Sequence, residues 1–404
     1  MKLSWLAIAF LLVSVPLLQP LAAAGATPTL SSVNLGTVPR GVAVDSNSGT
    51  IYAVLYLNGT TLALNPQTLA TVAKIPTPSP YAVAVNSVTD RVYVSQGQGG
   101  SLSVIDGSNN NVAATVGGLG TPYALAVDEE QNLVFAADTG GNTLWIVNGS
   151  NNAVAAHLAM GSTSALAVDP AAREAFVGNL TNNSQSGEVI VVNTTSLSVS
   201  RTFPVAVPPS RFTVDPSSHL LFISSENSGA GDNFVAIDDL TLQLIYSIHL
   251  GGAPNIIAVA PPDVYVSDVG LNRLYEIDGA TGQVLFNSTG GSNGITFTGI
   301  TSMAYDNLTG RLYITENDVT SLIVLSPGSA STSLDDSAYL LLAVPALAAG
   351  VAGLLAIYYI RRRTRSAAAR TVESNKSDVI HQNSSSNRAI PSECIIAPAL
   401  GSRT

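Results

Sequence analysis

The sequence contains only one cysteine, Cys394, among its 404 residues. With no second cysteine, no disulfide can form within the chain. Histidine is also scarce, with four residues, and charged residues make up only 11% of the chain. We find neither a nucleophile motif nor a glycine-rich phosphate-binding loop. A disulfide-stapled fold is therefore excluded, and no motif indicates nucleophilic catalysis or nucleotide hydrolysis.

Positive charge is scarce as well. The chain has 17 Lys and Arg against 27 Asp and Glu. The imbalance is larger between residues 26 and 337, where 8 basic and 24 acidic side chains give a net charge of −16. Because an acidic surface repels nucleic acid, we expect no nucleic-acid partner.

The first apolar stretch lies at the N-terminus. It has one early lysine, an apolar core and small residues at Ala22–Ala24. This pattern is typical of a secretory signal peptide, which we place at residues 1–24, with cleavage after Ala26 as the neighbouring alternative. A retained N-terminal anchor is the other interpretation. It is disfavoured because the apolar run is short and is interrupted by Pro16.

The second apolar stretch, residues 338–360, carries no charge and has tyrosines at both ends. It is long enough to span a bilayer as a helix of about 20 residues. The arginines at 361–363 and 365 favour the cytoplasm for the following segment. We therefore predict an ectodomain at 25–326, a linker at 327–337, a transmembrane helix at 338–360 and a disordered cytoplasmic tail at 361–404. The alternative for 338–360 is a buried core helix.

Seven similar segments fill the predicted ectodomain. In each, a short apolar strand precedes a strand with a central aromatic residue, and in six of the seven the first strand ends at Asp or Asn. The pairs are Asp45/Tyr52, Asn86/Tyr93, Asp128/Phe135, Asp169/Phe176, Asp215/Phe222, Ala260/Tyr265 and Asp306/Tyr313. A period of about 40–45 residues with several short strands is typical of a propeller blade. The sequence therefore predicts an all-β, seven-bladed β-propeller of four-stranded antiparallel blades.

The two ends of the repeat region complement each other. The seventh segment supplies only three strands before the linker, whereas residues 29–35 form a strand without a partner of its own. We predict that residues 29–35 pair with Ser321–Leu325 as the outer strand of the last blade. This pairing would close the ring and remove an open sheet edge.

The stretch VYVSQGQGGSLSVIDGSNNNVAATV, residues 92–116, has a near-copy in LVFAADTGGNTLWIVNGSNNAVAAHL. Both resemble the repeat of the YVTN-type β-propeller family, whose members are largely secreted or surface-attached proteins of archaea and bacteria. The resemblance covers residues 29–326 and implies the fold and a surface location, but little about function. The chain departs from the family in blades five and six and at the third position after the aromatic, which is often Asn in the family. That position holds Leu55, Gln96, Asp138, Asn179, Ser225, Asp268 and Glu316.

Four of these residues are candidate metal ligands. Asp138, Asp268 and Glu316, with Asn179, share one register and could form an arc of oxygen ligands around the channel mouth. Calcium prefers such ligands, and it is the only cofactor that the sequence suggests. We favour the other interpretation, in which these side chains cap their turns, as Asp and Asn commonly do.

The histidines do not point to a catalytic site. The repeat places His157 and His249 on outer strands, His219 in a turn on the face opposite the loop-rich mouth, and His381 in the tail. Propeller enzymes place their reactive groups at the mouth, so we predict no catalytic residue.

We therefore expect a single-pass membrane protein whose propeller acts as a binding or interaction module at the cell surface or envelope. Its partners would be the membrane and an extracellular protein or glycan bound at the loop-rich face. The alternatives are a propeller enzyme of the lyase or metal-dependent lactonase type and a structural coat component. The predicted glycosylation sites are Asn58, Asn148, Asn179, Asn182, Asn193, Asn287 and Asn307.

Overall fold

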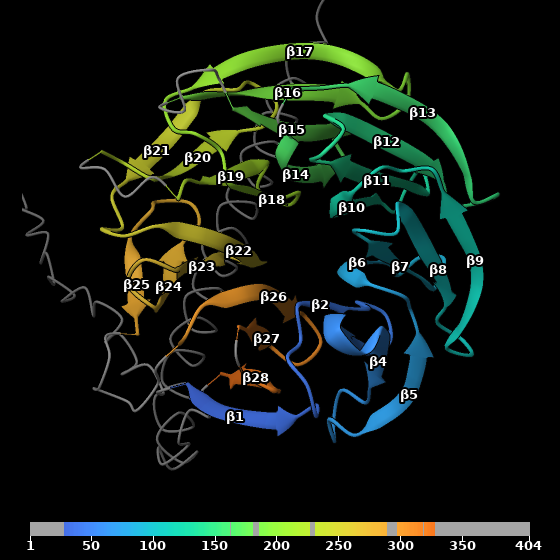
Figure 1. Cartoon of the computed structure of the whole chain (residues 1–404). Helices are drawn as coiled ribbons and strands as arrows, with labels where there is room; N and C mark the ends of the chain where they lie inside the picture. The colour runs from blue at the N-terminus through green and yellow to red at the C-terminus, as the bar shows by residue number, and fades with distance from the viewer. Residues whose placement is uncertain are drawn as a thin grey trace, which may run out of the picture. The chain divides into compact units, whose positions relative to one another are not determined.

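The computed structural model describes residues 28–161, 163–180, 186–226, 231–288, 297–317 and 319–327. These residues form 28 strands and one short 3₁₀ helix, η1 (Tyr56–Asn58), arranged in seven four-stranded sheets around a central axis (Figure 1). No helix within these ranges has the length and apolarity needed to cross a membrane. The predicted signal peptide and transmembrane segment lie outside the described residues.

Each blade is an antiparallel sheet whose strands follow one another from the axis outward. Blades one to three are β2 (Gly41–Val44), β3 (Ile51–Leu55), β4 (Thr60–Leu64), β5 (Thr71–Pro76); β6 (Pro80–Asn86), β7 (Arg91–Gln96), β8 (Ser101–Asp106), β9 (Asn111–Gly117); and β10 (Pro122–Asp128), β11 (Leu133–Asp138), β12 (Thr143–Asn148), β13 (Ala153–Ala159). Blades four and five are β14 (Thr163–Asp169), β15 (Glu174–Leu180), β16 (Gly187–Asn193), β17 (Ser198–Val205); and β18 (Arg211–Asp215), β19 (Leu220–Ser224), β20 (Phe234–Asp238), β21 (Leu244–Ile248). Blades six and seven are β22 (Pro254–Ala260), β23 (Asp263–Asp268), β24 (Arg273–Asp278), β25 (Val284–Asn287); and β26 (Ile300–Asp306), β27 (Arg311–Glu316), β28 (Ser321–Ser326) with β1 (Thr29–Asn34).

Burial differs between the strands of a blade in a way that the sequence explains. Every residue of β11 is buried, because neighbouring blades cover both of its sheet faces. The outer strand β13 is mostly exposed. Strands covered on both faces read as continuous apolar runs, whereas half-covered strands alternate. The second strands of the repeat are therefore the most uniformly apolar.

The core lies between blades rather than inside them. Phe176 of β15 is fully buried and belongs to one cluster with Leu221 and Ile223 of the next blade. Phe222 of β19 packs in the same way with Val264 of β23. Burying one such side chain stabilises the fold by about 1.5–3 kcal/mol. A single blade cannot obtain this burial alone, which explains the repetition.

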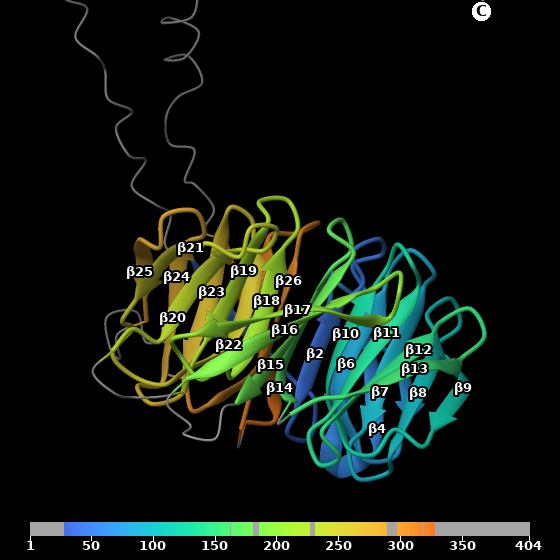
Figure 2. The same ribbon diagram turned by 90° about the horizontal axis from the view of Figure 1, so that it is seen from above.

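The ring closes as the sequence predicts. Strand β1 pairs antiparallel with β28, with Thr29 opposite Ser326 and Asn34 opposite Ser321. The propeller chain therefore begins and ends on one face, which also carries the turns between first and second strands. We call it the terminal face. The opposite face carries the turns between second and third strands, and we call it the mouth face; Figure 2 shows the ring turned by 90° from the view of Figure 1.

Candidate ligand-binding site at the mouth of the channel

A cavity of about 590 Å³ occupies the axis at the mouth face. Residues from the first half of all seven inner strands line it, together with single residues from the turns that follow β11, β23 and β27. Among the described residues that line it, the charged ones are Arg40 and Arg211, and none is aspartate or glutamate. The other polar lining residues are Tyr81, Tyr123, Thr139, Asn255, Thr301, Ser302 and Asn317.

An arginine and three tyrosines form a row along one side of this mouth. The guanidinium of Arg40 lies 4.2 Å from the ring centroid of Tyr81 and 5.8 Å from that of Tyr56, and Nη2 donates a 2.7 Å hydrogen bond to the Tyr81 hydroxyl. The Tyr81 and Tyr123 rings lie 4.4 Å apart at an angle of 59°. Cation–π and tilted aromatic contacts hold these groups in place before any ligand arrives.

The backbone around Tyr123 is fitted to this arrangement. A Cβ atom at Gly97 would lie only 2.7 Å from the Tyr123 ring, so no larger residue fits there unless the ring moves. Gly97 belongs to the turn after β7, in the neighbouring blade. The position of the aromatic ring is therefore set by two blades at once.

In the structure, the residues of the possible calcium arc form hydrogen bonds within their own blades. Oδ1 of Asp138 accepts bonds from Thr121 N–H and Oγ1–H at 2.9 and 2.7 Å, and from Gly140 and Gly141 N–H at 3.1 and 2.8 Å. Burial tends to raise the pKa of Asp138, but these bonds outweigh it and lower the pKa. Asp138 thus fixes the segment that leads into β10 and positions Tyr123.

The other members of the arc are also bonded within their own blades. Oδ1 of Asp268 accepts from Ala253 N–H at 2.9 Å, just before β22. Oε1 of Glu316 accepts from Thr298 N–H at 2.7 Å, just before β26. Burial raises the pKa of Glu316, and this bond partly offsets the effect.

Asn179 donates from Nδ2 to Glu188 Oε1 at 2.5 Å. The structure does not bring the carboxylates of the arc within 4.8 Å of one another in the part of the chain it describes. Asp138, Asp268 and Glu316 hydrogen-bond the segments that lead into the inner strands. Calcium at this position stays a prediction.

Charge is distributed unevenly around the ring. Arg40 and Arg211 precede and begin the inner strands of blades one and five, so both belong to the mouth face. Arg211 is exposed and donates from Nη1 to the Ser210 carbonyl at 2.8 Å. Two of only eight basic residues between positions 26 and 337 therefore line the cavity. An anion would meet favourable potential here and repulsion over the rest of the acidic surface.

The other predicted sites fall on the surface. His157 lies in β13, His249 directly follows β21 and His219 lies in the turn before β19, on the terminal face. Among the predicted glycosylation sites, Asn58, Asn287 and Asn307 are exposed, whereas Asn148, Asn179 and Asn193 are half-buried. Asn182 lies outside the described residues, as does His381.

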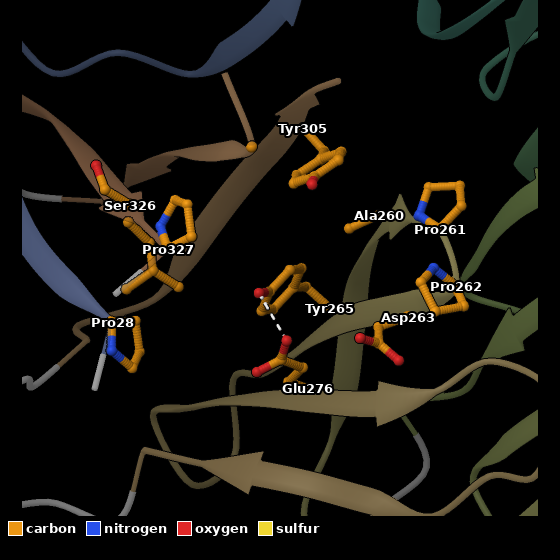
Figure 3. Close-up of a pocket in the computed structure, with 12 residues that line it drawn as sticks. Pro28, Ala260, Pro261, Pro262, Asp263, Tyr265, Glu276, Tyr305, Ser326 and Pro327 are labelled. Carbon is orange, nitrogen blue, oxygen red and sulfur yellow. Dashed lines mark hydrogen bonds between the residues drawn. The ribbon is translucent and has the colours of Figure 1, made fainter. Parts of the chain in front are cut away.

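A second hollow of about 190 Å³ lies on the terminal face between blades six and seven (Figure 3). Pro28 and Pro327, at the two ends of the described propeller, line one side of it. Tyr265 donates its hydroxyl to Glu276 Oε1 at 2.9 Å, and burial raises the pKa of the neighbouring Asp263. The hollow is small and its lining contains no cation, so it is a poorer candidate for an anionic ligand than the mouth.

The mouth residues were not identified from the sequence, although a signal exists. Arg40, Tyr81 and Tyr123 all stand five residues before the residue that closes an inner strand. This position is polar or aromatic in every copy of the repeat, next to strands that are otherwise apolar. The complete set is Arg40, Tyr81, Tyr123, Ser164, Ser210, Asn255 and Thr301.

Comparisons with solved structures agree with the fold. A chain of hydrazine synthase from Kuenenia stuttgartiensis superposes with a TM-score of 0.62 at 12% identity, covering 73% of this chain and 97% of that one. The β-propeller domain of Cps50 (Swd1) from Myceliophteria thermophila gives 0.62 at 10% identity, covering 74% and 99%. At such low identity the likeness shows the β-propeller fold alone. No family model and no curated protein matches the sequence.

Proposed function

We propose that this chain is a membrane-anchored binding module of the cell surface, of the YVTN-type propeller kind, and that its ligand is an acidic glycan bound at the channel mouth. The observation that carries the proposal is the contrast in charge. The described residues that line the cavity include two arginines and no carboxylate, whereas residues 26–337 have a net charge of −16. Nothing in the fold itself requires arginine at these positions, because the other blades place neutral residues there.

The chemistry of the mouth suits an acidic sugar. Guanidinium groups match carboxylates in planar, paired hydrogen bonds. Arg40 donates one of its N–H groups to Tyr81, and a guanidinium has five such donors. Tyr81 and Tyr123 also line the cavity, and their apolar ring atoms can contact the C–H groups of a sugar. A volume of about 590 Å³ lies within the range of known small-ligand sites.

The topology supports a ligand that arrives from outside. The propeller chain begins and ends on the terminal face, since Thr29 pairs with Ser326. If residues 338–360 span the membrane, the anchor is attached at this face. The mouth would then be presented away from the membrane, where cell-surface or matrix glycans are met.

The alternative functions make different demands on the site. A metal-dependent lactonase needs several oxygen ligands that converge in the channel, and the lining of the described cavity contains no carboxylate. A coat component needs lattice contacts rather than a saturable ligand. We therefore favour ligand binding over both.

The test uses the full-length protein purified in detergent, with polygalacturonate, an uncharged polysaccharide of similar length and polyglutamate as probes. We expect saturable binding of polygalacturonate that weakens with salt. Arg40→Gln should weaken it about tenfold or more, because a charge-assisted hydrogen bond contributes about 1.5–3 kcal/mol. Arg91→Gln is the matched control. Arg91 lies on the terminal face in an exposed pair with Asp106 at 3.2 Å, and its loss should leave binding unchanged.

Three results would overturn the proposal. Equal binding of the neutral polysaccharide would show that charge is irrelevant. An unchanged affinity in Arg40→Gln would show that the mouth is not the site. Binding of polyglutamate without polygalacturonate would identify an acidic peptide as the ligand class instead.

A further inference from the structure

On the terminal face, between blades four and five, three ligand-type side chains converge. Asp169 closes β14, His219 lies in the turn before β19 and Asp239 follows β20. Nδ1 of His219 lies 3.5 Å from Asp169 Oδ2 and 3.4 Å from Asp239 Oδ1. One ligand atom from each residue lies within 4.8 Å of the other two. Both carboxyl side chains are fully buried, whereas the imidazole is 39% exposed and gives access from solvent.

The facing atoms of this group lie at ion-pair distance from one another but meet no hydrogen-bond criterion. Asp169 Oδ2, His219 Nδ1 and both carboxylate oxygens of Asp239 are buried, and no described residue forms a hydrogen bond with them. Arg201 lies beside the group, but its Nη2 donates to Glu174 Oε2 at 2.7 Å and to the backbone carbonyl of Asp239 at 3.0 Å. When His219 is neutral, no described cation faces the two buried carboxyl groups, and burying both as carboxylates costs several kcal/mol. A positive species between them would remove that cost.

The repeat shows that this arrangement is not a requirement of the fold. In blades one, five and seven, the second oxygen of the closing aspartate accepts a hydroxyl from Ser48, Ser218 and Thr309, at 2.8, 2.7 and 2.5 Å. Blade four has Ala172 at that position, which cannot donate. Asp169 Oδ2 therefore lacks the hydroxyl donor of those blades because of a single departure from the repeat.

Asp239 is a second departure. Its backbone N–H donates to the His219 carbonyl at 3.0 Å. In blades two, three and six, the N–H groups of Gly107, Gly149 and Gly279 make the corresponding bond. Blade five alone places a carboxylate at this position of the repeat, and it faces the only histidine found in any of the equivalent turns. Residues that depart from the repeat pattern and lie close together in the structure are more often needed for function than for stability.

We infer that Asp169, His219 and Asp239 form a binding site for a divalent transition-metal ion, for which zinc is the representative, with water completing the coordination. Ligands about 2.1 Å from a tetrahedral zinc ion lie about 3.4 Å apart, close to the two measured separations. Three protein ligands leave one position open toward the exposed edge of the imidazole. Calcium and magnesium fit less well, because both prefer shells made of oxygen alone.

A proton is the competing occupant. Burial, together with the adjacent Asp169 carboxyl, raises the pKa of Asp239 to about 8. The two carboxyls could then share a proton in place of a metal ion. If a metal ion binds, removing the Asp239 carboxylate weakens metal binding. If the two carboxyls share a proton, removing the Asp239 carboxyl raises the stability of the fold. One set of variants therefore distinguishes the two.

The test is zinc titration of the full-length protein after chelator treatment, by calorimetry and by metal analysis. We expect one zinc ion per chain and a rise in melting temperature. Asp239→Gly, which introduces the residue of blades two, three and six, and His219→Asn, which tolerates the positive φ of 55° at this turn, should each weaken binding by more than about 100-fold. Ala172→Ser should give Asp169 a donor and weaken binding about 10–100-fold, the usual range for changes beside a ligand.

His157→Asn and His249→Asn are the matched controls, because they remove other histidines of the propeller without touching this group. They should leave zinc affinity unchanged. The inference is overturned if the wild-type protein takes up no zinc while Asp239→Gly gains stability, which is the result for a shared proton. It is also overturned if Asp239→Gly and His219→Asn bind zinc as well as the wild type, or if calcium binds more tightly than zinc.

Discussion

The hydroxyl of Tyr93 offers a test of the energetics of the blade core. Tyr93 lies in β7 with no exposed surface, and its hydroxyl has no hydrogen-bond partner among the described residues. Burial also raises its pKa. Blades three to five carry phenylalanine at the same position of the repeat. A buried, unpaired hydroxyl costs about 1–3 kcal/mol. Tyr93→Phe removes it and keeps the ring, so we expect the free energy of unfolding to rise by about 1 kcal/mol.

Tyr275 provides the matched control with the opposite sign. It is 4% exposed in β24, and its hydroxyl donates to the Leu250 carbonyl at 2.8 Å. Tyr275→Phe leaves that buried carbonyl without its donor. We expect this variant to lose about 1 kcal/mol.

Urea unfolding of both variants, followed by tryptophan fluorescence and by circular dichroism, measures the two effects. For a domain of this size, 1 kcal/mol corresponds to a shift in melting temperature of about 2–4 °C. A loss of stability in Tyr93→Phe as large as that in Tyr275→Phe would refute the reasoning, because it would show that the Tyr93 hydroxyl has a stabilising partner.

Two further predictions concern ring closure and the clamp on the mouth. Deleting residues 25–35 removes β1 with its packed Val33 and Leu35 and exposes the edge of β28. Thermal unfolding should show a loss of about 2 kcal/mol or more, and an unchanged melting temperature would contradict the closure. The lowered pKa of Asp138 means that its charge stabilises the fold above the unfolded pKa of about 3.9, and that this stability is lost as pH falls through the lower, folded pKa. Asp138→Asn should therefore be less stable than the wild type near neutral pH, with a difference that narrows below about pH 4. A constant difference in unfolding free energy across this range would show that the charge has no such role.

Much of the fold could be predicted from the sequence because one pattern occurs seven times. The spacing from Asp45 to Tyr52 recurs along the chain, and the continuous apolar second strands indicate sheets covered on both faces. The strand at residues 29–35 had no partner of its own, and the last blade lacked its fourth strand. We therefore predicted that the two pair, and the pairing of Thr29 with Ser326 confirms this. These are properties of local spacing, which a sequence records directly.

The sites could not be predicted in the same way, because they depend on how blades face one another. Asp169, His219 and Asp239 each look like an ordinary turn residue, and 70 residues of sequence separate the first from the last. The structure brings them together because the turns of adjacent blades meet on one face. The arginine and tyrosines of the mouth were missed for a related reason, although the loop-rich face was expected to bind the ligand. Arg40 and Tyr123 occupy one variable position of the repeat, and only the ring arrangement shows that this position lines the channel.

The expected orientation on the membrane gives the last prediction. The two chain ends of the propeller lie on the terminal face, and the predicted linker of residues 327–337 would span only about 18–20 Å as a flexible chain. The terminal face, with its proposed metal site, should therefore lie toward the membrane. Gln98 is exposed on the mouth face and Asn109 on the terminal face of the same blade. With Cys394 replaced by serine, Gln98→Cys should react faster than Asn109→Cys with a bulky, impermeant maleimide on intact cells. The two should react equally in detergent. Faster labelling at position 109 on cells would reverse the orientation, and labelling of neither until the cells are permeabilised would place the propeller on the cytoplasmic side.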